Sequence, residues 1–288
     1  MPAFSTRYHT VEIDGLDVFY REAGDPANPT LLLLHGFPSS SHMFRNLMAA
    51  LSDDYHLIAP DHVGFGQSAM PSVEEFTYSF DRLTEITEKL IAHLGLERFA
   101  IYIHDYGAPI GLRIATARPE RITGIVSQSG NAYMEGFTPF WDVLFAHAAD
   151  RAANEQEVRG YLTLAKTHWQ YTHGVPADRL DRIAPETWLT DQAGLDRPGN
   201  DAIQLQLFWD YQFNLGGYPG FQEYFRTHQP PLLVTWGKND EIFGAAGAEA
   251  FKRDLPDGEY HLLDAGHFAL ETHGEEISGY VREFMGRL

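Results

Sequence analysis

The sequence predicts an α/β fold with a mostly parallel sheet, flanked by helices and interrupted by a helical insertion. Continuous apolar runs such as TLLLLHG and FAIYIHD end at glycine or polar residues, which is typical of strands buried on both faces of a sheet. Amphipathic stretches such as DRLTEITEKLIAHLGL alternate with these runs. Strands that alternate with helices at this spacing indicate a parallel sheet with right-handed crossovers.

The first 130 residues contain most of these elements. A period-two pattern around Asp14 and Gly15 predicts an opening hairpin. The patterns that follow alternate between strand and helix, in the order TLLLLHG, SSHMFRNLMAAL, HLIAPD, DRLTEITEKLIAHLGL, FAIYIHD, APIGLRIATARP and ITGIVSQSG. We therefore expect the first part of the core to span residues 1–130.

The composition and the predicted secondary structure change after this segment. Residues 131–229 are rich in aromatic residues and histidine, read as short helices and lack an apolar strand run. Strand patterns return in PPLLVTWGKND and EYHLLDAGH, and EEISGYVREFM closes the chain as a helix. The sequence thus predicts a helical cap at 131–229 and a second part of the core at 230–288, with a pocket between cap and sheet.

Composition excludes several classes of protein. The formal net charge of −19 argues against a nucleic-acid partner and against an anionic membrane surface. Cysteine is absent, which excludes disulfides, thiolate catalysis and Cys-ligated zinc. No apolar run approaches the length of a membrane span, and the N-terminus lacks a secretory pattern. We expect a cytoplasmic protein, monomeric or homodimeric, with no metal and no cofactor, since no metal-ligand spacing such as HExxH occurs.

Three strand ends carry residues that suit nucleophilic catalysis. Asp105 lies between a buried strand and the helix that begins near Gly107, at a sharp turn of the nucleophile-elbow type. Asp240 follows the strand in LLVTWGKND, and His267 follows the strand in EYHLLDAGH. The order nucleophile, acid, histidine is that of an α/β-hydrolase triad.

These motifs resemble those of the α/β-hydrolases with an aspartate nucleophile, which include epoxide hydrolases and haloalkane dehalogenases. HGFP, APDHVGFGQS, IHDYGAPIG, WGKND and AGHFALE each stand where this family has its own version. The resemblance covers essentially the whole core and implies the α/β-hydrolase fold, with a mostly parallel eight-stranded sheet and an inserted helical cap. HGFP resembles the HGxP of epoxide hydrolases and predicts a cis peptide before Pro38.

A carboxylate nucleophile suits displacement at an sp³ carbon better than acyl transfer, because it is already ionised at neutral pH. The resemblance implies that Asp105 opens an epoxide or expels a halide and becomes an alkyl ester. His267, oriented by Asp240, would then activate water to hydrolyse the ester. The backbone N–H groups of Phe37 and Tyr106 would hold the oxyanion.

The group that leaves the substrate distinguishes an epoxide hydrolase from a haloalkane dehalogenase. Epoxide hydrolases stabilise the alkoxide with cap tyrosines, for which Tyr211 and Tyr171 are the candidates, with Tyr161 as the next choice for the second position. Dehalogenases usually use Trp indoles, one of them directly after the nucleophile, where this chain has Tyr106. The cap tryptophans Trp141, Trp169 and Trp209 are the alternative donors, although core packing is the more ordinary role for them.

The sequence therefore predicts a hydrolase for a small apolar epoxide, with water as the second substrate. A haloalkane substrate is the alternative, and it is favoured by the loops DHVGFGQS and EEFTYSF, which look closer to dehalogenases. Fluoroacetate is disfavoured because the arginine that follows the nucleophile in those enzymes is absent. A non-catalytic small-molecule-binding protein on the same scaffold is the remaining alternative.

Overall fold

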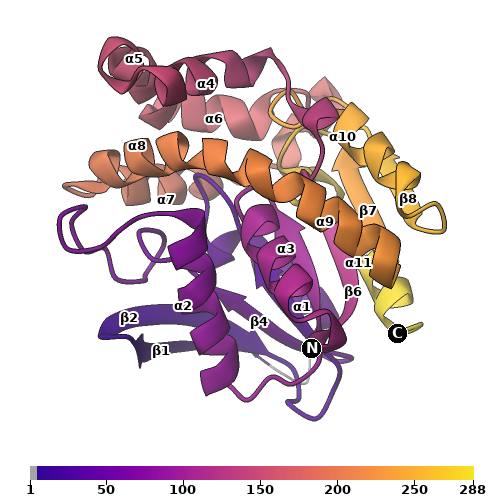
Figure 1. Cartoon of the computed structure of the whole chain (residues 1–288). Coiled ribbons are helices and arrows are strands. Elements are labelled where there is room, and N and C mark those ends of the chain that lie inside the picture. Colours follow the sequence, from indigo (N-terminus) through magenta and orange to yellow (C-terminus); the bar gives the residue numbers. More distant parts are fainter. Residues whose placement is uncertain (1–4) are drawn as a thin grey trace.

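The computed structural model describes residues 5–288, and one eight-stranded sheet forms its centre (Figure 1). The strand order is β1-β2-β4-β3-β5-β6-β7-β8. β1 and β2 pair antiparallel, as do β2 and β4, and the remaining pairs are parallel. The strands are β1 (Arg7–Ile13), β2 (Leu16–Ala23), β3 (Thr30–Leu34), β4 (His56–Pro60), β5 (Phe99–His104), β6 (Ile122–Gln128), β7 (Leu232–Gly237) and β8 (Glu259–Leu263). The predicted mostly parallel sheet is confirmed.

The opening hairpin forms where the sequence predicts it. Ile13 pairs with Leu16, and the two residues between them are Asp14 (φ 52°) and Gly15 (φ 75°). Positive φ at both central residues is the backbone that a tight type I′ hairpin turn requires.

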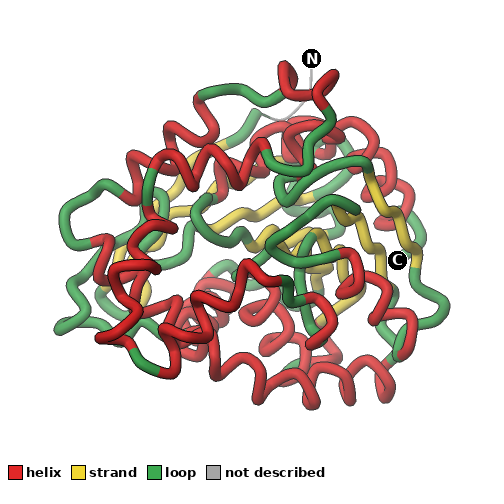
Figure 2. Tube along the Cα trace, turned by 90° about the horizontal axis from the view of Figure 1, so that it is seen from above, coloured by secondary structure: helices red, strands yellow, loops and turns green. Residues whose placement is uncertain are grey.

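Helices cover both faces of the sheet, as the view from above shows (Figure 2). Successive leucines of β3 point to opposite faces, because side chains alternate along a strand. Leu32 and Leu34 belong to the core cluster that contains α2 and α3 side chains, whereas Leu31 and Leu33 belong to the cluster with α1 and α11. The core helices are α1 (Arg45–Leu51), α2 (Phe80–His93), α3 (Gly107–Ala117), α10 (Ala245–Ala250) and α11 (Ala269–Met285).

The chain between β6 and β7 is helical and lies over one end of the sheet (Figure 1). Its helices are α4 (Asp142–Ala149), α5 (Arg151–Val158), α6 (Leu164–Thr172), α7 (Glu186–Leu195), α8 (Asn200–Asp210) and α9 (Asn214–His228). α9 extends from this region to pack against α3. None of the helices within residues 5–288 combines the length and apolar character that a membrane span requires.

Candidate active site

Asp105 sits on a strained turn between β5 and α3. Its φ is 49°, in the left-handed region that residues other than glycine rarely adopt. Gly107 permits the turn, because a Cβ at this position would lie 2.1 Å from the carbonyl oxygen of Leu34. The turn lifts the buried Asp105 side chain out of the sheet, in the geometry of a nucleophile elbow.

Backbone N–H groups hold the Asp105 carboxylate in place. The N–H of Phe37 donates to Oδ1 at 2.7 Å, and the N–H of Tyr106 also donates to the carboxylate. Gly36 allows this approach, since a Cβ there would lie 2.2 Å from Oδ1. The Phe37–Pro38 peptide is cis, as the HGFP motif predicts. Both candidate oxyanion donors therefore face the carboxylate, and their catalytic role stays a prediction.

Burial raises the pKa of Asp105 to about 6, although the charge of His267 and the two backbone N–H groups oppose the increase. The carboxylate is thus ionised at neutral pH and poorly solvated. A nucleophile in that state is more reactive than one surrounded by water.

Asp240 and His267 form a buried pair beside Asp105. Nδ1 of His267 lies 2.9 Å from Oδ2 of Asp240. Three further donors fix the Asp240 carboxylate: the hydroxyl of Ser129 at 2.7 Å, the N–H of Ile242 at 2.8 Å and the N–H of Phe243 at 3.1 Å. The acid can therefore orient the imidazole with little freedom of its own.

The second nitrogen of His267 is available for chemistry. Nε2 is buried and has no hydrogen-bond partner among the described residues. Burial lowers the pKa of His267, but the charge and hydrogen bond of Asp240, together with the charge of Asp105, outweigh this effect and raise it above its usual value. His104 packs against the imidazole with a ring separation of 4.6 Å. An imidazole oriented in this way can accept a proton from water at Nε2.

A narrow cavity opens above Asp105, between the sheet and the cap. The cavity volume that the centre of a water molecule can occupy is about 20 Å³. This is close to the volume that a single water requires. A substrate can enter only if cap or core side chains move. The cavity is lined by Phe37, Asp105, Tyr106, Phe140, Trp141, Leu144, Gln170, Phe208 and Ile242.

Tyr211, a candidate acid, is buried next to this cavity. Its ring lies 5.9 Å from that of Tyr106 and 4.4 Å from that of Trp141, and its hydroxyl hydrogen-bonds with Tyr218. Burial raises the pKa of Tyr211 well above its usual value, and the nearby Asp105 charge adds to the increase. The indole N–H of Trp141 donates to the carbonyl of Ile242 at 2.8 Å, so it is not free for a halide in this structure.

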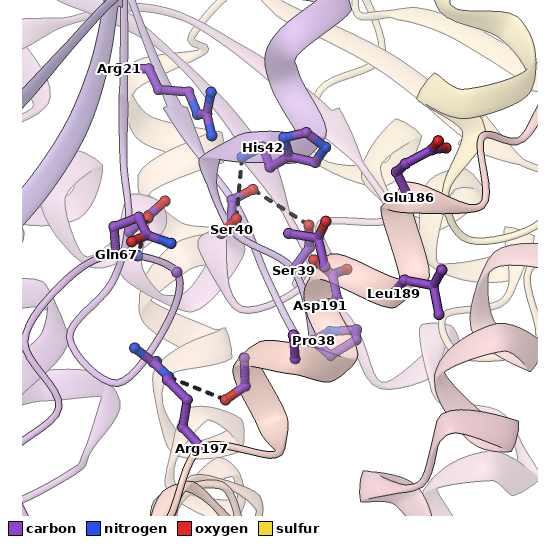
Figure 3. Close-up of a pocket in the computed structure, with 15 residues that line it drawn as sticks. Arg21, Pro38, Ser39, Ser40, His42, Gln67, Glu186, Leu189, Asp191 and Arg197 are labelled. Atoms are coloured by element: carbon purple, nitrogen blue, oxygen red, sulfur yellow. Dashed lines mark hydrogen bonds between the residues drawn. The ribbon is translucent and has the colours of Figure 1, made fainter.

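Tyr171, the other candidate acid, lies outside the set of residues that line the cavity, as Tyr211 does. Its hydroxyl donates to Asp191 at 2.5 Å, and its ring stacks on Phe268 at 3.9 Å. Asp191 also interacts with Ser39 at a larger polar pocket between α7 and the core loops (Figure 3). Burial raises the pKa of Asp191 to about 7. Tyr161 is likewise committed, because its hydroxyl donates to the carbonyl of Phe140 at 2.9 Å.

The sequence-based prediction did not identify two polar residues at the site. Ser129 follows β6, which lies between β5 and β7 in the sheet, and it bonds Asp240. Its position directly after a buried strand was the available signal. Gln170 lines the cavity from α6, and no local pattern distinguishes it from other polar cap residues.

The cap rests directly on the loops that carry the acid and the histidine. A Cβ on Gly174 would lie 2.4 Å from the carbonyl of Asn239, and one on Gly266 would lie 2.0 Å from the carbonyl of His173. Asn239 also donates its side-chain amide to the carbonyl of Gly174 at 2.8 Å. Cap and triad loops thus meet closely, with no room for a Cβ at Gly174 or Gly266.

The alpha/beta hydrolase fold family model matches residues 29–274. The chain therefore belongs to this family, as the strand order and the elbow indicate. It is 46% identical over 287 residues to the Uncharacterized hydrolase YNR064C of Saccharomyces cerevisiae, covering 96% of this chain and 98% of that protein.

Two further comparisons relate the chain to haloalkane dehalogenases. It is 26% identical over 285 residues to the Haloalkane dehalogenase of Mycolicibacterium paratuberculosis, covering 91% of this chain and 85% of the other. The haloalkane dehalogenase DatA from Agrobacterium tumefaciens C58 shares the fold with a TM-score of 0.79 at 21% identity, covering 98% of this chain and 97% of that one. The protein is a hydrolase of the α/β-hydrolase type.

Proposed function

We propose that the protein hydrolyses a carbon–oxygen bond at an electrophilic sp³ carbon through a covalent ester on Asp105. The substrate is an epoxide and the product is a vicinal diol. The observation that carries the proposal is the Asp105 carboxylate itself. It is buried on a strained elbow, held by the N–H of Phe37 and adjacent to a His267–Asp240 pair. No proton has to be removed from such a nucleophile before it attacks.

The first half-reaction forms the ester. Because Oδ1 is held by Phe37, Oδ2 attacks the ring carbon, the carbon–oxygen bond of the epoxide breaks and its electron pair goes to the ring oxygen. That oxygen takes a proton from Tyr211, the candidate acid beside the cavity. The product is an alkyl ester of Asp105.

The second half-reaction hydrolyses the ester. Nε2 of His267 takes a proton from water, and the hydroxide adds to the ester carbonyl carbon while the N–H groups of Phe37 and Tyr106 hold the oxyanion. Collapse breaks the acyl–oxygen bond, and the leaving alkoxide takes the proton from His267. The proton that Asp105 retains returns through solvent to Tyr211, so one water is consumed in each cycle.

Contacts on the cap side support an oxygen leaving group. The Tyr211 ring packs against the lining residues Tyr106 and Trp141, whereas the Trp141 indole donates to a backbone carbonyl. Haloalkane dehalogenation is the second candidate, and the dehalogenase relative that covers most of the chain favours it. It uses the same ester and needs no proton for the leaving group.

The test is a paired turnover assay with styrene oxide and 1-bromobutane, in which diol and bromide are both quantified. The expected result is diol formation that falls strongly in Tyr211→Phe. Tyr55→Phe is the matched control, because its hydroxyl donates to the carbonyl of Arg282 in the core. Bromide release that is unaffected by Tyr211→Phe would instead support the dehalogenase reading. Intact mass of a His267→Gln variant then separates an enzyme, which accumulates an adduct, from a binding protein, which does not.

A further inference from the structure

The cavity above Asp105 contains a side-chain N–H group that no described residue satisfies. Gln170 lines this cavity and is 2% exposed, and its Nε2 has no hydrogen-bond partner among residues 5–288. A buried amide that donates to nothing destabilises the folded protein. Its presence in a lining that is aromatic and aliphatic apart from Asp105 points to a partner that is bound only during the reaction.

The other N–H donors of the lining already have acceptors. The backbone N–H groups of Phe37 and Tyr106 donate to Asp105, and the indole of Trp141 donates to the carbonyl of Ile242. Among the described lining residues, the Gln170 amide is thus the side-chain nitrogen that a ligand atom can still engage.

Helix α6 fixes the direction of this amide. Trp169, one residue earlier, stacks on Phe140 at 5.8 Å, and Tyr171, one residue later, stacks on Phe268 at 3.9 Å. Both neighbours of Gln170 are thus anchored, and Gln170 itself lines the cavity from α6 of the cap, whereas Asp105 lines it from the elbow after β5.

We propose that the Gln170 amide donates a hydrogen bond to the atom that leaves the substrate carbon. This inference rests on the proposed function, because it needs a leaving atom. As Oδ2 of Asp105 attacks from the sheet side, the broken bond's electron pair moves to an atom on the cap side, where Gln170 lies. The amide stabilises this negative charge without giving up its proton, and for an epoxide the proton still comes from Tyr211.

The Tyr106 hydroxyl is the competing donor. It is also buried without a partner among the described residues, and Tyr106 lines the same cavity. Tyr106 follows Asp105 on the elbow, whereas Gln170 belongs to helix α6 of the cap. Variants of the two residues are therefore compared in the same assay.

The test measures ester formation alone. In a His267→Gln background the ester accumulates, so intact mass against time with styrene oxide and with 1-bromobutane gives its rate of formation. Gln170→Met removes the N–H at nearly constant volume, and we expect ester formation to slow by about 10²-fold. The control is Gln206→Leu, a cap residue whose amide oxygen accepts from Arg151 instead.

Two further readouts separate this role from a structural one. In the His267-containing protein, Gln170→Met should slow ester formation and leave ester decay unchanged in quenched-flow mass spectrometry. Its Tm should stay level or rise, because an unsatisfied buried amide is removed. A drop in Tm with equal slowing of both steps would indicate misfolding and would overturn the assignment.

The outcomes distinguish the two proposals. If His267→Gln accumulates no adduct with either substrate, the proposed function fails and the role of Gln170 fails with it. If the adduct forms equally fast with and without Gln170→Met, only the assignment of Gln170 is wrong. Slowing in Tyr106→Phe but not in Gln170→Met would transfer the role to Tyr106.

Discussion

The carboxylates on the sheet side of the cavity are held by several donors, although Nε2 of His267 and the Tyr106 hydroxyl on that side have no partner among the described residues. On the sheet side, the Asp240 carboxylate receives three donors besides His267, and Asp105 receives two backbone N–H groups. On the cap side, the Gln170 amide has no partner among the described residues and the remaining lining is mostly aromatic. The two acids thus have fixed positions, whereas the cap amide has an N–H group that a ligand atom can still engage.

Removal of the proposed nucleophile should give the largest effect. Asp105→Ala leaves no carboxylate to attack carbon, so we expect turnover to fall by about 10⁶-fold and no adduct to form. Diol and bromide assays, with intact mass after incubation, measure both. Appreciable turnover in this variant would mean that the sheet side is not the chemical centre.

Asp240→Asn should mainly affect the second half-reaction. The amide keeps the shape but cannot stabilise a protonated His267, so ester hydrolysis should slow by up to about 10⁴-fold while ester formation changes little. Single-turnover mass spectrometry separates the steps. Asp264→Asn, an exposed acid that pairs with Lys238, is the control and should behave as the wild type.

Gly36→Ala tests the close backbone approach on the sheet side. The added Cβ would lie 2.2 Å from Oδ1 of Asp105 and 2.6 Å from the nitrogen of Tyr106, so the oxyanion contacts must shift. We expect a loss of about 10²–10³-fold in turnover. Gly160→Ala, where a Cβ meets nothing within 4 Å, should leave turnover intact. Equal activity in the two variants would contradict the role of the Phe37 and Tyr106 N–H groups.

The pH dependence of kcat/KM should show the smallest change. Only ionised Asp105 attacks, and burial raises the pKa of Asp105 to about 6, so kcat/KM should fall about tenfold per pH unit as the pH drops below this value. The charge of His267 lowers the Asp105 pKa. In His267→Gln the midpoint of ester formation should therefore move to higher pH, and a shift to lower pH would count against the coupling.

The structure brings together the three residues that the sequence placed at strand ends, whereas the positions of cap residues did not follow from the sequence, for a physical reason. Asp105, Asp240 and His267 follow parallel strands, and the carboxyl ends of such strands meet at one edge whatever their separation along the chain. The same rule could have found Ser129. Cap donors depend instead on how helices rotate against one another. Tyr171 and its neighbour Gln170 are adjacent in sequence, yet the tyrosine hydroxyl bonds Asp191 while the glutamine lines the cavity.

The contact between cap and triad loops limits how the enzyme can be recombined. Gly174 of the cap lies against Asn239, and Gly266 lies against the cap carbonyl of His173, each at a separation that excludes a Cβ. A chimera that receives the cap of a relative inherits this junction along with the new specificity. A chimera should therefore stay folded and active when the new cap supplies glycine at position 174. A bulkier residue there would push apart the loops that carry Asp240 and His267.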